Sequence, residues 1–154
     1  MTDIVALHRA AIVATMQTVP GIGQVHGYER YAKQDAAFRD LYKSGDRILG
    51  WHVRRVSTRE TSEALGRYHG QIGWRIRGFM SIDDAAASEQ AFDTLIDALR
   101  DAFRADESLG GAVDSTLEPD SNQVGLQLDD SGPVMFAGVL CHGCTLSLTT
   151  LYPL

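Results

Sequence analysis

Two thiols and an imidazole stand close together near the C-terminus, in the segment Cys141-His142-Gly143-Cys144. Two cysteines at this spacing can hold one side of a tetrahedral zinc site. The sequence has no other cysteine to complete such a site, and covalent haem attachment needs a histidine directly after the second cysteine. In a strand, the two cysteine side chains would point to opposite faces. We therefore expect buried free thiols, with no bound metal and no cofactor.

Residue types suited to acid–base or nucleophilic catalysis are present, but they form no catalytic motif. These candidate bases and nucleophiles are His52, His69, His142, Ser57, Ser62 and Ser147. None lies in a nucleophile elbow or a triad signature. Gly21-Ile22-Gly23 and Gly70-Gln71-Ile72-Gly73 lack the further glycine or lysine of a phosphate loop. We expect no catalytic centre, and an enzyme or a small-molecule binding domain remains only as an alternative.

Arginines are concentrated in the middle third of the chain, at Arg54, Arg55, Arg59, Arg67, Arg75 and Arg77. From Asp106 onward the sequence has no lysine or arginine, but it has the acidic residues Asp106, Glu107, Asp114, Glu118 and Asp120. The net charge of −6 argues against broad affinity for nucleic acid, which needs clustered basic residues. The asymmetry can serve electrostatic pairing between neighbouring copies, or the arginines can form a solvated strand face.

The composition predicts one folded domain that covers residues 1–154. Hydrophobic residues make up 44% of the sequence and charged residues 22%, as in ordinary globular proteins. No apolar run approaches the roughly 18 residues that a membrane span needs, and the N-terminus does not resemble a signal peptide. We expect a protein that is made and kept in the cytosol and has no membrane partner.

Two segments have the periodicity of amphipathic helices. Residues 3–19 form the first, with Thr2 or Asp3 as the cap and Pro20-Gly21-Ile22-Gly23 as the stop. Its apolar stripe is Ile4, Leu7, Ala11, Ile12 and Met16. The second begins at Asp83 or Asp84, ends before Gly110-Gly111, and has the stripe Phe92, Leu95, Ile96, Leu99 and Phe103.

Residues 31–46 form a polar connection of mixed charge between the first helix and the strands that follow. A weak helix is possible at Asp35–Tyr42. The apolar content predicts a segment that is mobile in the isolated subunit and becomes ordered on assembly, with Phe38 and Tyr42 as anchors.

Alternating polarity predicts strands at Arg47–Arg59 and Tyr68–Ser81, paired antiparallel through a polar connection at Ser57–Gly66. Trp51 and Trp74 are expected in the core. Arg75 and Arg77 lie on the polar face of the second strand, where they can bind carboxylates of a neighbouring subunit. The remaining extended segments are predicted at Gln24–Glu29, Ala112–Leu117, Gln123–Leu128 and Val134–Leu151, with turns at Glu118–Asn122 and Asp129–Pro133.

This order of elements predicts an α+β fold with a mixed, mostly antiparallel sheet flanked by two main helices on one side. The pattern resembles the phage tail terminator proteins, a family that includes minor tail proteins of lambda-like phages, tail completion proteins and relatives in gene transfer agents. The features that support the resemblance are the helix ending near Pro20-Gly21, the strand ending in Trp51-His52-Val53-Arg54, the amphipathic strand, the long helix Asp84–Ala105 and the final strand Val139-Leu140-Cys141-His142.

The resemblance implies a structural protein of a virion or gene transfer agent. Such proteins form a homohexameric ring on the head-proximal end of the tail tube, where the ring ends tube polymerisation and offers the surface for head–tail joining. The implied partners are other copies of the chain, the tail tube protein and the head–tail connector or neck protein, with DNA only as passing cargo. The implied location is the host cytoplasm during assembly and then the tail of the particle.

A neck or connector protein of the same particle is the alternative to the terminator. For a ring, the sequence predicts a head-to-tail subunit interface formed by basic, aromatic and acidic side chains. The candidate interface residues are Arg54, Arg75, Arg77, Phe38, Tyr42, Asp114 and Glu118.

Overall fold

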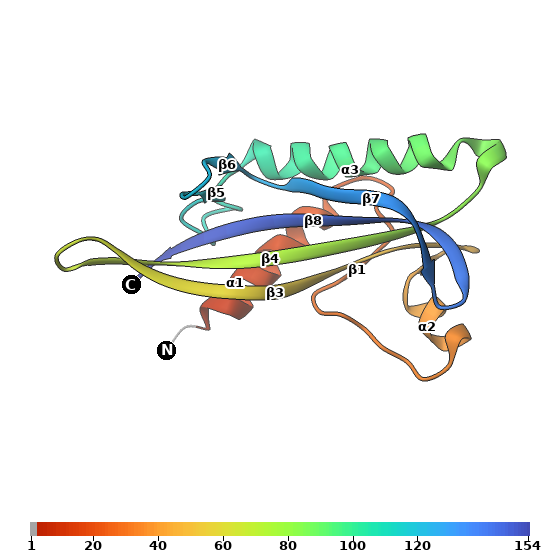
Figure 1. The fold of residues 1–154 in the computed structure, drawn as a ribbon, viewed down its shortest axis with the longest axis horizontal. Coiled ribbons are helices and arrows are strands. Elements are labelled where there is room, and N and C mark those ends of the chain that lie inside the picture. Colours follow the sequence, from red (N-terminus) through yellow and green to blue (C-terminus); the bar gives the residue numbers. More distant parts are fainter. Residues whose placement is uncertain (1–2) are drawn as a thin grey trace.

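The computed structural model describes residues 3–154, which form a six-stranded, mostly antiparallel sheet with helices on both of its faces and a separate sheet of two short strands (Figure 1). The helices are α1 (Ile4–Gln17), α2 (Asp35–Leu41) and α3 (Ser88–Ala105), and a 3-10 turn, η1 (Asp84–Ala86), precedes α3. The strands are β1 (Gln24–His26), β2 (Lys43–Ser44), β3 (Arg47–Ala64), β4 (Arg67–Ser81), β5 (Leu117–Glu118), β6 (Gln123–Val124), β7 (Gln127–Phe136) and β8 (Val139–Pro153). The predicted α+β class is confirmed.

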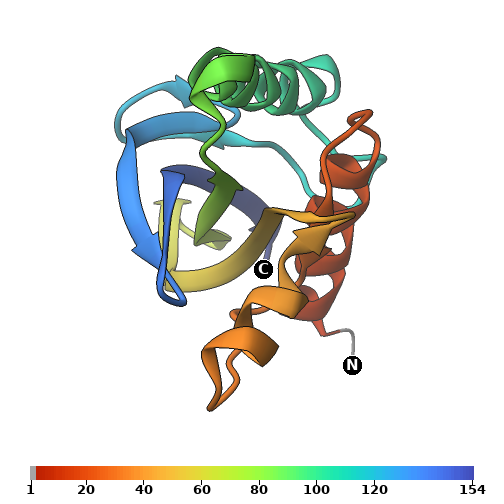
Figure 2. The same ribbon diagram turned by 90° about the vertical axis from the view of Figure 1, so that its right-hand side faces the viewer.

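The main sheet has the strand order β1-β3-β4-β8-β7, and β2 pairs with the start of β3. The short β1 runs parallel to β3, and the other neighbours are antiparallel. The sheet curves strongly, as the view along the strands shows (Figure 2). Strands β3 and β4 have 18 and 15 residues, and their hairpin extends beyond the rest of the protein (Figure 1).

The main core lies between α1, α3 and one face of the sheet. Trp51 stacks on Phe92 of α3 with a ring-centroid distance of 5.6 Å, and its Nε1 donates a hydrogen bond to the Ile22 carbonyl oxygen at 2.8 Å. Trp74 is buried in the same core. The predicted burial of both tryptophans is confirmed.

Helix α1 buries a histidine that the predicted stripe did not include. Leu7 is 42% exposed, whereas His8 is buried and its Nδ1 lies 2.8 Å from Thr150 Oγ1. Trp74 Nε1 donates to the same oxygen at 2.9 Å, so a polar network satisfies all three buried groups. Asp3 caps the helix by accepting from the Ala6 amide at 3.0 Å, and Thr2, the other predicted cap, lies outside the described residues.

A second, smaller core lies on the opposite face of the sheet, under α2. Its buried residues are Tyr42, Ile48, Phe79, Phe136 and Cys141, and Phe38 of α2 packs against them. Segment 31–46 thus packs against the sheet through α2 and Tyr42, and its mobility in the isolated subunit, with ordering on assembly, stays a prediction. Few apolar residues are needed to pack this segment on the sheet, because Tyr42 and Phe38 make aromatic contacts with Phe136 at centroid distances of 4.9 and 5.0 Å.

The β3–β4 hairpin has a much shorter turn than the sequence predicted. The strands continue to Ala64 and resume at Arg67, so Leu65 and Gly66 alone connect them. The antiparallel pairing is confirmed, but the assignment of residues 57–66 as a connection was wrong. Beyond the core, both faces of the hairpin meet solvent, so its strands are polar and show no apolar alternation.

The C-terminal strands also differ from the prediction. Residues 129–133, expected to be a turn, lie within β7, and the predicted single strand 134–151 is interrupted by a turn at Ala137-Gly138. Both turn residues have positive φ, 48° and 81°, as a two-residue hairpin turn requires. The polar run with Pro133 is tolerated in β7 because β7 is an edge strand of the sheet.

Several other helix and strand boundaries differ from those that the sequence predicted. Helix α3 begins at Ser88 because Ala87, with φ of 53°, separates it from η1. Its apolar stripe is otherwise as predicted, with Phe92, Ile96, Leu99 and Phe103 buried. In the predicted strand 112–117 only Leu117 is in a strand, β5. None of the described helices is long and apolar enough to span a membrane.

Candidate subunit interface

Arg54, Arg75 and Arg77 lie on one face of the sheet, opposite the main core. In the β3–β4 register Arg54 is directly opposite Arg75, and His52 is opposite Arg77. Helix α2 and the second core cover only one end of this face, and Arg75 is exposed to solvent. The structure thus brings the three predicted interface arginines together on one face, with Arg54 and Arg75 exposed and Arg77 half-buried at the end that α2 covers.

Arg54 and Arg75 form an unusual cross-strand pair because both are cations. Like charges at directly opposite positions destabilise an antiparallel sheet. The one carboxylate paired with either of them in the described chain is Glu29, whose Oε1 lies 3.8 Å from Arg54 Nη1. An incoming carboxylate would reduce this repulsion, so the surface is suited to an acidic partner.

Phe38, Tyr42 and Arg77 meet at a cavity of about 120 Å³, together with His52, Glu29, Phe79, Met135 and Phe136. The Arg77 guanidinium lies over the Phe79 ring at 5.2 Å, and Tyr42 Oη lies 3.1 Å from His52 Nδ1. Burial lowers the pKa of His52 to about 4. The imidazole is therefore neutral at pH 7.

Tyr42 is only 1% exposed, and burial raises the pKa of its hydroxyl. A side chain so deeply buried offers no surface to another subunit. Tyr42 is a core residue, which corrects its prediction as an interface contact. Phe38 is partly exposed at the edge of the same core, so it remains a candidate.

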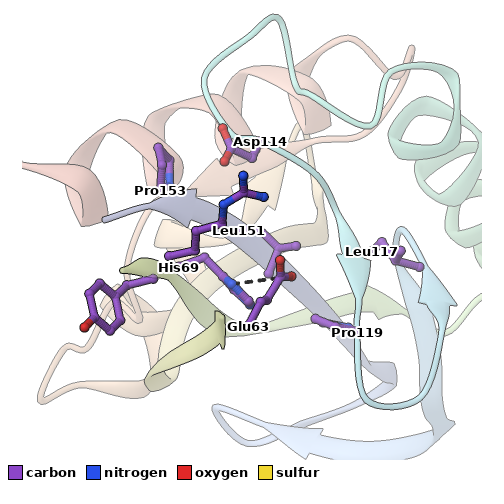
Figure 3. Close-up of a pocket in the computed structure, with 9 residues that line it drawn as sticks. Glu63, His69, Asp114, Leu117, Pro119, Leu151 and Pro153 are labelled. Atoms are coloured by element: carbon purple, nitrogen blue, oxygen red, sulfur yellow. Dashed lines mark ion pairs between the residues drawn. The ribbon is translucent and has the colours of Figure 1, made fainter. Parts of the chain in front are cut away.

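Asp114 and Glu118 lie elsewhere, at the base of the projecting hairpin. Asp114 lines an open hollow of about 370 Å³, shown in Figure 3, where His69 Nδ1 lies 3.7 Å from Glu63 Oε1. The Asp114 amide donates to the Leu151 carbonyl oxygen at 2.9 Å, which holds this loop against β8.

Glu118 makes its hydrogen bonds within its own turn. Its carboxylate accepts from the Asp120 amide at 3.1 Å and from the Ser121 amide at 2.6 Å. The Ser121 hydroxyl bond is the main reason that the pKa of Glu118 is lowered, and Arg59 contributes in the same direction. The sequence suggested that no basic side chain neutralises this acidic third of the chain, but Arg59 of β3 lies near enough to do so in part.

Sequence reasoning missed two other groups of exposed residues. Asp129 and Asp130 were assigned to a turn, but they lie side by side on β7, at the outer edge of the sheet. Tyr28 and Tyr31 lie beside Arg54, in the segment that follows β1. The unbroken absence of basic residues after Arg104 was the one signal that could have drawn attention to the two aspartates.

The two cysteines lie on opposite faces of the sheet, as predicted. Cys141 belongs to the second core and Cys144 to the main core, and both are free thiols. Burial raises the pKa of Cys144 to about 12, so this thiol stays protonated. Within residues 3–154, no three potential ligands are grouped closely enough to hold a metal ion.

We expect the folded protein to be indifferent to metal chelators. Two cysteines on opposite faces cannot coordinate one ion, so treatment with a strong chelator should leave the melting temperature unchanged. Thermal unfolding before and after chelation, with zinc analysis of the protein, measures this. Stoichiometric zinc whose removal lowers the melting temperature would contradict the prediction.

No family model matches this sequence, and no curated protein matches it either.

Proposed function

We propose that this protein is the subunit of a closed homo-oligomeric ring, a hexamer, that caps the head-proximal end of a phage-like tail tube. The ring ends tube polymerisation and provides the surface to which the head attaches. Its partners are further copies of itself, the tail tube protein and the head–tail connector, and DNA passes through it only as cargo.

The observation that supports this proposal is the repulsive Arg54–Arg75 pair on a sheet face that α2 leaves open. A monomer gains nothing from two cations held opposite each other, whereas a subunit that receives carboxylates from a neighbour does. The net charge of −6 also fits a ring through which DNA passes, because like charge keeps the cargo from binding.

The Arg75→Glu variant tests the ring. It places a carboxylate opposite Arg54, so the monomer should fold at least as well as wild type, while the acidic partner is repelled. We expect the concentration needed for assembly to rise about tenfold or more, which corresponds to about 1.4 kcal/mol. Raised salt should weaken wild-type assembly as well.

The measurement is the mass by light scattering, at high concentration and with tail tubes present. Arg104→Glu is the matched control, because it makes the same charge change on α3, where Arg104 pairs with Asp101 at 2.6 Å. Arg77→Glu should also weaken assembly, but Arg77 packs on Phe79, so it is the less clean variant. A wild type that stays monomeric even with tubes would remove the ring.

A further inference from the structure

A hollow of about 340 Å³ lies beside β3, between the segment after β1 and Arg54 and Arg55. Tyr28 and Tyr31 are 58% and 70% exposed at this place. We call this surface, together with Arg30, the tyrosine–arginine hollow. Tyrosine and arginine are enriched among the residues that dominate protein–protein binding.

The tyrosine–arginine hollow has an excess of positive charge. It contains Arg30, Arg54 and Arg55 but a single carboxylate, that of Glu29, which lies 3.8 Å from Arg54 and raises the pKa of the Tyr31 hydroxyl. The Arg30 guanidinium lies over the Tyr28 ring at 5.3 Å, which holds it at the surface. Arg9, which lines the floor, donates to the carbonyl oxygens of Gly27 and Val53 and is not free for a partner.

The opposite edge of the sheet carries a pair of adjacent carboxylates, Asp129 and Asp130, both exposed. A β-bulge between Leu128 and Asp130 interrupts the register there, and bulges re-aim side chains. Asp129 accepts a hydrogen bond from the Ser147 hydroxyl at 3.1 Å, which places it on the same sheet face as Arg54. We call these two residues the β7 acidic pair.

The two surfaces lie at the same level of the sheet. One row across the strands is Arg54, Arg75, Ser147 and Gln127, and the next is His52, Arg77, Thr145 and Asp130. Contact between the two edges therefore needs no displacement along the strands. A head-to-tail contact closes into a ring only when the rotation from one copy to the next closes, so two surfaces at the same level are compatible with a ring.

We propose that the β7 acidic pair of one copy docks into the tyrosine–arginine hollow of the next copy. This inference rests on the proposed ring and names its contact surfaces. Each subunit then carries one surface of each kind on opposite edges, as a heterologous ring interface requires. The β7 acidic pair replaces Asp114 and Glu118 as the acidic side, because it lies on the sheet edge opposite the hollow. Asp114 lies instead at the base of the projecting hairpin, and the Glu118 carboxylate is bonded to two amides of its own turn.

Two charge-reversed variants test the contact. The acid-reversed variant carries Asp129→Arg and Asp130→Arg, and the base-reversed variant carries Arg54→Glu and Arg55→Glu. Each alone should fail to assemble at concentrations where wild type does, with an affinity loss of about a hundredfold or more. An equal mixture should recover assembly, because wild-type contacts then alternate with contacts in which both charges are reversed.

The fold of each variant is checked by circular dichroism and thermal unfolding. All four positions are exposed, and Arg54→Glu removes the repulsion with Arg75, so the monomers should remain folded. Asp129→Asn with Asp130→Asn is a milder second variant that should also weaken assembly. Asp93→Arg with Asp101→Arg, on exposed positions of α3, is the matched control and should assemble normally.

The outcomes separate this inference from the proposed function. If wild type assembles and both reversed variants do too, the ring stands, the docking is overturned, and the β7 acidic pair only protects a sheet edge from unwanted pairing. If both variants fail and their mixture does not recover, the two surfaces do not meet and the docking is again overturned. If wild type never assembles, even with tubes, the ring itself is removed.

Discussion

The Gly78→Ala variant should lose about 3 kcal/mol of unfolding free energy, a large share of the stability of a domain of this size. A Cβ at position 78 would overlap the Trp51 ring at Cε3 and Cζ3. That ring cannot move aside, because it stacks on Phe92 and its Nε1 is bonded to the Ile22 carbonyl oxygen. The only ways to accept one methyl group are to shift β4 or to break this packing.

Gly132→Ala is the matched control, because it makes the same change in β7, where nothing lies within 4 Å of the added Cβ. It should be neutral or slightly stabilising, since alanine restricts the unfolded chain. Urea unfolding of both variants beside wild type measures the difference. Equal stability of the two variants would show that the sheet adapts at Trp51, contrary to the packing described above.

The parts of the fold that were predictable are those with strong apolar periodicity. The stripe of α3 and the burial of Trp51 and Trp74 follow from patterns long enough to exclude other arrangements. The pattern also placed Arg75 on the outer face of β4. Periodicity reports which side of an element meets the core, so it succeeds wherever an element has one buried side.

The wrong predictions concern strands that have no buried face and strands that contain residues typical of turns. Asp129–Pro133 has turn composition, yet it runs on as an edge strand, where proline and charge are tolerated. The real turn at Ala137-Gly138 contains a single glycine and carries little local signal. The hairpin beyond Arg55 is polar on both faces, so no alternation marks it as a strand.

The candidate interface was predictable on its basic side only. Arg54, Arg75 and Arg77 were found because strand alternation sorts residues by face. Tyr42 was misjudged because a second core under α2 depends on contacts with Phe136, which is 94 residues later in the chain. The β7 acidic pair was missed because its position depends on strand order, which a single sequence does not specify.

Acidification should destabilise the fold through His52. The side chain is 3% exposed beneath Tyr42, and burial lowers its pKa from 6.5 to about 4. Arg77, His26 and Arg54 act in the same direction, and Glu29 opposes them. Burial also lowers the pKa of His8, against a smaller opposing effect of Asp114.

The direction of this pH effect on stability follows from proton uptake. Below pH 6.5 the histidine of the unfolded chain binds a proton, while His52 in the folded protein stays neutral until about pH 4. The stability that is fully present above pH 6.5 is therefore lost progressively as the pH falls to about 4. Each pKa unit corresponds to about 1.4 kcal/mol, so the loss from His52 amounts to about 3 kcal/mol.

The test compares urea unfolding at pH 7 and pH 4.5 for wild type and for His52→Asn, whose amide can still bond the Tyr42 hydroxyl. Carboxylates titrate in both proteins, so the difference between their pH dependences isolates the histidine. We expect the variant to lose about 2 to 3 kcal/mol less than wild type over this range. Tyr42→Phe should keep most of the wild-type pH dependence, because burial rather than the hydroxyl is the main cause of the lowered pKa. Identical pH dependence in His52→Asn and wild type would mean that His52 takes up its proton in the folded state, and that the cavity beneath α2 is open to water.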